Sequence, residues 1–227
     1  MYCCNPACSS PENPDSNQFC QGCGLSLWQQ PLFRGRYEVV KVLGQGAFGR
    51  TYLAKNKDRF DSLCVIKKFI AEAQGSKAKE LFEQEGKSLY DLDHPQIPRL
   101  QAYFAQDNSI YLVQDYVEGE NLLKELLKEG AFNEQKLLEF LRDFLPVLQY
   151  IHRQGLLHRD IRPENIMRRR SDGKIFLIDF GGVKHHLQTV SISGTVLYTA
   201  GYAPYEQVIG KPRCASDIYS LGATSIR

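Results

Sequence analysis

Two aspartates, Asp160 and Asp179, lie in the stretch that most constrains what this chain can fold into. The first belongs to H-R-D-I-R-P-E-N at residues 158–165, in which an asparagine follows the aspartate by five residues. The second opens D-F-G at 179–181, directly after the apolar run 174–178, which we expect to be a strand. The two motifs stand in this order, and their aspartates are 19 residues apart. This arrangement would place a carboxylate that can act as a base, two further side chains that can hold cations, and a basic residue within reach of one active site.

A glycine-rich turn precedes this stretch. Residues 43–51 read L-G-Q-G-A-F-G-R-T, which is G-x-G-x-x-G between two expected strands at 37–43 and 51–55. Glycines let backbone N–H groups approach phosphate oxygens closely, because no Cβ intervenes. A dinucleotide-binding fold uses the same spacing but follows it with a helix, whereas a strand follows here. The pattern favours a nucleotide loop, and a hairpin turn without a ligand is the alternative.

The rest of the chain shows strands first and helices later. His94 and Pro95 should end the first long helix, and Pro146 should kink the last one. Further strands are expected at 63–69 and 110–116, and helices at 77–92, 122–128 and 136–153. This segregation predicts an α+β fold with two lobes of different class.

Together these motifs resemble the eukaryotic-type Ser/Thr protein kinases over residues 37–227. The resemblance implies an antiparallel β N-lobe with one helix at 37–117, including a hinge, and a mainly α C-lobe at 118–227. It implies phosphoryl transfer from ATP to Ser/Thr hydroxyls of protein substrates, with Mg²⁺ or Mn²⁺. Kinases continue for several helices after the one that starts near Asp217, so the C-lobe is expected to be truncated. A catalytically weak nucleotide-binding or scaffold protein is the alternative.

The resemblance assigns the roles in phosphoryl transfer. Asp160 would accept the proton of the substrate hydroxyl. Arg162 stands where these kinases usually carry Lys and would keep a positive charge near the transferred phosphate. Asn165 and Asp179 would hold the Mg²⁺ ions through hard oxygen ligands.

A lysine on the third strand would anchor the phosphates. By its spacing from the glycine turn Lys67 is that residue, and Lys68 should point to the opposite face because strand side chains alternate. Lys67 needs a carboxylate, for which Glu85 is the candidate and Glu83 the competitor. The nucleotide contacts that the resemblance implies, besides Lys67 and Glu85, are Leu43, Gly44, Gly46, Gly49, Thr51, Val65, Asp115, Val117, Met167, Asn165 and Asp179.

Residues 182–206 resemble an activation segment, with Thr199 at the substrate-positioning threonine. Candidate phosphorylation sites are Thr189, Ser191, Ser193 and Thr195. Glu206 is expected to be a buried carboxylate whose usual arginine partner is missing, and Asp217 to brace the catalytic loop. We expect His158 to pack against Phe180 rather than to act in acid–base chemistry.

Five of the seven cysteines lie within residues 3–23, in a segment (1–27) that shows almost no core-forming periodicity. Two close pairs of thiolates suit a tetrahedral structural Zn²⁺ in a zinc-ribbon-like module, followed by a linker at 28–36. The motif resembles the N-terminal Cys motif of a group of cyanobacterial Ser/Thr kinases, which favours Cys3 over Cys4 as a ligand. The proposed ligands are Cys3, Cys8, Cys20 and Cys23. A redox-active or disulfide cluster and a disordered segment are the alternatives.

Net charge and hydropathy argue against several classes of partner and against a membrane-spanning or exported protein. The net charge of +2 argues against nucleic acid or an anionic membrane as the main partner. The arginine run at 168–170 is short and is expected to be a solvated loop between strands. No stretch approaches the ~20 apolar residues that a membrane span requires. The first 30 residues are too polar for a signal peptide, so we expect a cytoplasmic protein whose partners are ATP and protein substrates. A zinc-dependent interaction module remains a rival function.

Overall fold

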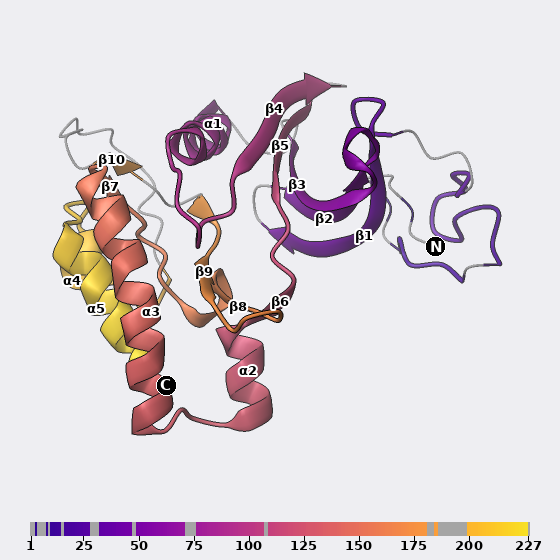
Figure 1. Ribbon diagram of the computed structural model, residues 1–227. Coiled ribbons are helices and arrows are strands. Elements are labelled where there is room, and N and C mark those ends of the chain that lie inside the picture. Colours follow the sequence, from indigo (N-terminus) through magenta and orange to yellow (C-terminus); the bar gives the residue numbers. More distant parts are fainter. Residues whose placement is uncertain are drawn as a thin grey trace. The chain divides into compact units, whose positions relative to one another are not determined.

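The computed structural model describes residues 3, 8, 10–14, 16–27, 32–46, 49–70, 76–106, 109–180, 184–185 and 199–226. These residues form two compact units (Figure 1). Unit 1 comprises Met1–Phe82 and Leu100–Tyr116, and unit 2 comprises Glu83–Arg99 and Val117–Arg227. Helix α1 (Ser76–Tyr90) therefore contributes residues to both.

Unit 1 contains a five-stranded antiparallel sheet in the order β1-β2-β3-β5-β4 (Figure 1). The strands are β1 (Tyr37–Gly46), β2 (Gly49–Asn56), β3 (Ser62–Ile70), β4 (Leu100–Gln106) and β5 (Ser109–Asp115), with the 3-10 turn η1 (Lys57–Arg59) after β2. The four strands expected from sequence between residues 37 and 116 are confirmed. Strand β4 was not predicted, because its alternating pattern is weak.

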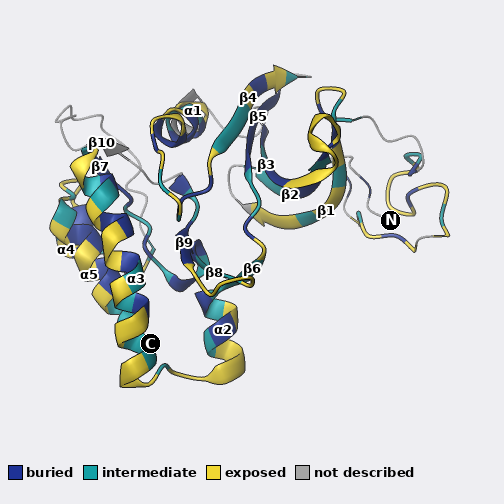
Figure 2. Ribbon diagram, in the orientation of Figure 1, coloured by how far each residue is buried: buried dark blue, intermediate teal, exposed yellow. Residues whose placement is uncertain are grey.

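The two faces of this sheet differ in character. One face carries an aromatic core in which Tyr52 lies opposite Ile66, and this core also takes in Phe33 from the expected linker. Lys68 belongs to this face, with its Nζ 5.5 Å from the centre of the Tyr111 ring. Figure 2 shows the buried residues running along β2, β3 and β5. The expected opposition of Lys67 and Lys68 is thereby confirmed.

Unit 2 is mainly helical, as predicted, and contains two small sheets. Its elements are β6 (Gly119–Asn121), α2 (Leu122–Glu129), α3 (Glu134–Arg153), β7 (Leu156–Leu157), η3 (Pro163–Asn165), β8 (Ile166–Arg169), β9 (Ile175–Leu177), β10 (Lys184–His185), α4 (Tyr205–Val208) and α5 (Cys214–Ser225). Helices α3 and α5 lie side by side (Figure 1). Among the described residues, none of the helices combines the length and the apolar character that crossing a bilayer requires.

A capping residue explains where helix α3 begins. The side chain of Asn133 accepts a hydrogen bond from the backbone N–H of Lys136, so α3 begins at Glu134, two residues before the predicted start. The helix buries Phe144 and Val147 and continues through Pro146 as a single element, and the predicted kink at this proline stays a prediction.

The arginine run at 168–170 departs from the prediction of a solvated loop. Its first two residues lie in β8, because this strand pairs with both β6 and β9. Each arginine also forms an ion pair with a carboxylate, and the pairs are Arg168–Glu125, Arg169–Asp172 and Arg170–Glu118. The run is therefore part of a sheet, and its charges are paired with carboxylates rather than free in solvent.

Candidate active site

The loop of unit 2 that carries the predicted catalytic residues runs from the end of β7 through η3 into β8. Asn165 donates its Nδ2 to the Asp160 carbonyl oxygen at 2.9 Å and to the Asp160 carboxylate at 2.7 Å. The amide nitrogen is therefore directed at Asp160, and the amide oxygen is the atom of Asn165 that can ligate a cation. Asn165 is buried, whereas Asp160 is half-buried.

Thr199 is bonded to the other carboxylate oxygen of Asp160. Its hydroxyl donates to Asp160 Oδ1 at 2.8 Å and accepts from Arg162 Nη1 at 3.1 Å. Arg162 also forms a two-bond contact with Glu164, and this hydrogen bonding raises the pKa of the guanidinium. The structure thus brings Asp160, Arg162, Asn165 and Thr199 into one hydrogen-bonded group.

A buried carboxylate braces the loop from α5. Asp217 is fully buried and accepts from the backbone N–H groups of His158 at 2.9 Å and Arg159 at 2.8 Å. Its Oδ2 also lies 2.8 Å from His152 Nε2. Arg159 has a φ of 64°, which costs energy for a non-glycine residue, so the bond from Asp217 helps to hold a strained backbone. The predicted bracing role of Asp217 is confirmed by this geometry.

The D-F-G segment lies against the same loop. The backbone N–H of Ile178 donates to the Asn165 carbonyl at 2.9 Å, which brings the segment that carries Asp179 next to Asn165. Phe180 is buried, and its ring contacts His158 edge-on with the ring centres 5.0 Å apart.

His158 packs as predicted. Burial lowers its pKa, although the nearby carboxylates of Asp217, Asp160 and Asp179 act in the opposite direction. A neutral, fully buried imidazole suits a packing role better than proton transfer with solvent.

In unit 1 the glycine turn joins β1 to β2. Gly49 has a φ of 147°, and a Cβ there would lie 1.9 Å from the Lys68 carbonyl oxygen, so the β2–β3 pairing itself requires glycine at this position. Among the residues that the structure describes, a Cβ on Gly44 would meet nothing within 4 Å, so packing does not explain that glycine. Gly44 is therefore available for the close approach of a ligand.

The remaining predicted nucleotide contacts are divided between the two units. In unit 1, Thr51 lies opposite Lys67 on the face of the sheet away from the aromatic core. Val65 comes two residues before Lys67 in β3 and therefore lies on the same face. The residues in unit 1 are Leu43, Gly44, Gly46, Gly49, Thr51, Val65, Lys67 and Asp115, and those in unit 2 are Glu85, Val117, Asn165, Met167 and Asp179. Glu85 is buried and Glu83 is half-buried. The pairing of Lys67 with a carboxylate stays a prediction.

Glu206 corrects a prediction. The sequence suggested a buried carboxylate without a partner, but Glu206 is half-buried and accepts a hydrogen bond from Ser216 Oγ at 2.8 Å. Ser216, three residues into the start of α5, was missed as a partner because arginines were the expected donors. The candidate phosphorylation sites at 189, 191, 193 and 195 lie outside the described residues.

Two polar residues that bond to the loop or lie in it were also missed, Gln207 in α4 and Glu164 in η3. Gln207 is buried and donates to the Arg159 carbonyl at 2.6 Å, and Glu164 contacts Arg162. Only Glu164 had a signal in the sequence, since an acid two residues from an arginine can pair with it.

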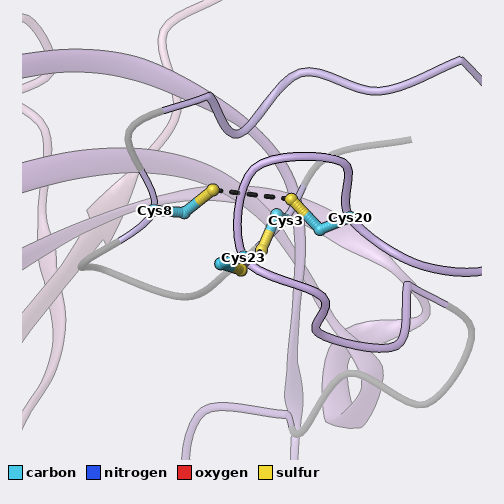
Figure 3. A group of neighbouring side chains, drawn as sticks. All are labelled: Cys3, Cys8, Cys20 and Cys23. Carbon is cyan, nitrogen blue, oxygen red and sulfur yellow. Dashed lines mark hydrogen bonds between the residues drawn. The ribbon is translucent and has the colours of Figure 1, made fainter.

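The N-terminal module brings four thiols together. The sulfur atoms of Cys3, Cys8, Cys20 and Cys23 all lie within 4.8 Å of one another (Figure 3). The Cys3–Cys23 separation is 3.5 Å and the Cys8–Cys20 separation is 3.4 Å. Four sulfurs at about 2.3 Å from a tetrahedral zinc would be about 3.8 Å apart, so these residues fit that ion. Cys4 lies outside the described residues.

Neighbouring residues shape this thiol cluster. A Cβ on Gly22 would come within 3.0 Å of Cys8 Sγ, so glycine allows the two cysteine turns to approach. Asn13 donates to Cys20 Sγ at 3.4 Å and accepts from the Gln21 N–H at 2.8 Å. Burial opposes the Cys20 thiolate, but hydrogen bonds from Asn13 and nearby backbone N–H groups lower its pKa to about 6. The charged form that binds metals is therefore favoured at Cys20.

Comparison with known proteins agrees with this geometry. Residues 37–227 match the protein kinase domain family, and the chain belongs to that family. Serine/threonine-protein kinase B of Synechocystis sp. is 42% identical over 240 residues, covering 99% of this chain and 41% of that protein. PknA of Nostoc sp. is 40% identical, covering 87% of this chain and 37% of that protein. Serine/threonine-protein kinase F of Synechocystis sp. is 36% identical, covering the whole chain and 51% of that protein. The chain spans about two fifths to half of these relatives.

Proposed function

We propose that this chain transfers the γ-phosphoryl group of ATP to serine and threonine hydroxyls of protein substrates. The observation that carries the proposal is the arrangement around Asp160, whose carboxylate is oriented by Asn165 and Thr199. The names of the relatives, which are serine/threonine-protein kinases, support the same reaction class.

Asp160 acts as the base in this mechanism. Its two oxygens are held by different side chains, so the carboxylate has a fixed orientation toward an incoming hydroxyl. Proton acceptance by a positioned side chain contributes typically about 10²- to 10⁴-fold to a rate. Arg162 is placed beside Asp160 through Thr199 and supplies positive charge for the transferred phosphoryl group.

The other predicted residues would bind the metal ion and the nucleotide. The amide oxygen of Asn165 and the carboxylate of Asp179 are hard oxygen ligands of the type that Mg²⁺ prefers, with Mn²⁺ as an alternative. Bound Mg²⁺ would neutralise charge on the phosphates. Lys67, held by Glu85, would contact the phosphates, and Val65 and Met167 would line the adenine site.

Two substitutions test these assignments. Asp160→Asn should lower turnover by roughly 10²-fold or more, because it removes the base, and should leave ATP binding intact. Asp179→Asn should instead weaken Mg²⁺-dependent nucleotide binding, because one hard ligand is lost. Asp172→Asn, which alters an exposed pair with Arg169, is the matched control. Nucleotide binding without any turnover in the unaltered chain would favour a scaffold protein instead.

The thiol cluster supports a second proposal, a structural zinc ion held by Cys3, Cys8, Cys20 and Cys23. A short segment with few apolar residues gains its folding energy from such an ion. Thiolate ligands persist in a reducing compartment, which is the reason to place the protein in the cytoplasm. Elemental analysis of protein purified without added metal should find about one zinc per chain. Cys3→Ser should remove the zinc and Cys4→Ser should not, whereas freely titrating thiols without zinc would refute the proposal.

A further inference from the structure

Glu164 makes a two-bond contact with Arg162 in the loop that carries Asp160. Its carboxylate accepts from Arg162 Nε at 2.9 Å and from Arg162 Nη2 at 2.7 Å, so both oxygens engage one guanidinium. Each side chain of the pair is about a quarter to a third exposed, at 27% for Arg162 and 30% for Glu164. Such a two-bond contact fixes the plane of the guanidinium as well as its position.

The fixed plane directs the third nitrogen of Arg162. With Nε and Nη2 bonded to Glu164, Nη1 donates to Thr199 Oγ1 at 3.1 Å. Thr199 in turn donates to Asp160 Oδ1 at 2.8 Å. A continuous series of hydrogen bonds therefore runs from Glu164 through Arg162 and Thr199 to the base.

The local backbone explains why these two side chains meet. Arg162 precedes η3 in an extended conformation, with φ −160° and ψ 159°, and the buried Pro163 follows it at the first position of the turn. Proline fixes its own φ and favours an extended residue before it, so Pro163 restricts the backbone of Arg162 to the extended conformation that the structure shows. A lysine at position 162 would be a single point donor and could not be held in one plane by a carboxylate.

We infer that Glu164 is a positioning residue for the reaction, acting on Asp160 through Arg162 and Thr199. This inference rests on the proposed kinase function. It predicts that Glu164 affects the chemical step only when Arg162 is present. It also assigns a role to the difference at position 162, where an arginine stands in place of the usual lysine.

A double-substitution cycle tests this dependence. Glu164→Gln keeps the size of the side chain but weakens the two-bond contact, and it should lower kcat about tenfold with KM for ATP within about twofold, a loss equivalent to about 1.4 kcal/mol. In the Arg162→Lys background, Glu164→Gln should change kcat by less than about twofold. The matched control is Asp172→Asn, which breaks a similar contact with Arg169 away from the loop and should leave kcat unchanged.

The outcomes separate this inference from the proposed function. Equal kcat in the unaltered and Glu164→Gln chains, or the same loss whether position 162 carries arginine or lysine, would overturn the inference and leave the kinase function standing. Absence of turnover in an unaltered chain that binds Mg·ATP would overturn both. A second measurement, ¹⁵N NMR of the Arg162 guanidinium, does not depend on activity. The two Nη groups should give separate signals while Glu164 restrains them, and these signals should merge in Glu164→Gln. Unchanged signals in that variant would also overturn the inference.

Discussion

Replacing Asp217 by asparagine should destabilise unit 2 strongly although the two side chains have the same shape. In the native chain one oxygen of Asp217 accepts from the Arg159 N–H, and the other faces the His158 N–H and His152 Nε2. Asparagine has a single acceptor oxygen, so its NH₂ group must face at least one backbone N–H. A donor would then oppose a donor inside the protein, where Asp217 is fully buried.

The expected cost follows from these bonds. Leaving one buried donor unsatisfied costs about 1–3 kcal/mol, and each remaining bond changes from charge-assisted to neutral, at about 1 kcal/mol apiece. The sum is about 3–5 kcal/mol. For a chain of this length such a loss lowers Tm by roughly 6–20 °C.

Thermal unfolding followed by circular dichroism, together with denaturant titration, measures this difference. Asp172→Asn is the control, because that exposed carboxylate pairs with Arg169 on the surface and its replacement should cost less than about 1 kcal/mol. A change below about 1 kcal/mol in Asp217→Asn would refute the reasoning, since it would mean that the carboxylate does not hold the catalytic loop.

Three further predictions use other parts of the chain. Gly49→Ala should lower Tm markedly, because its Cβ would lie 1.9 Å from the Lys68 carbonyl, whereas Gly44→Ala should change Tm little; equal Tm values would contradict this. Burial depresses the folded pKa of His158, so its contribution to stability is full above pH 6.5 and is lost as pH falls below that value. Denaturant titrations from pH 7.5 to 5 should therefore show that the free energy of unfolding depends less on pH in His158→Phe than in the unaltered chain. The same pH dependence in both chains would contradict this prediction. Burial raises the pKa of Cys64 to about 11, so iodoacetamide at pH 8 should label Cys64 only after unfolding; mass spectrometry showing equal labelling of folded protein would contradict this.

The sequence predicts those helices and strands whose own residues show a recognisable pattern. Periodicity and β-branching located β3 and α3, and the alternation of side chains placed Lys67 and Lys68 on opposite faces. Ligand spacing predicted a cluster of four cysteines, and the choice of Cys3 over Cys4 came from the resemblance to the N-terminal Cys motif of a group of cyanobacterial kinases. These features depend on residues that are near in sequence or that share one chemistry.

Contacts that depend on tertiary packing could not be read in this way. Ser216 bonds Glu206 and Gln207 bonds Arg159, and nothing in a serine or glutamine marks its distant partner. Strand β8 includes Arg168 because it pairs with β6 and β9, and Arg168 contacts Glu125 in α2; a local pattern reveals neither.

The central claim is that the group around Asp160 transfers phosphoryl groups to hydroxyls. Its most direct test is a single-turnover reaction with γ-labelled Mg·ATP and a generic protein substrate, followed by mass spectrometry of the labelled residues. The account predicts label on serine and threonine with the unaltered chain and at least about 10²-fold less label with Asp160→Asn. Label confined to tyrosine, or equal labelling by the unaltered and Asp160→Asn chains, would contradict it.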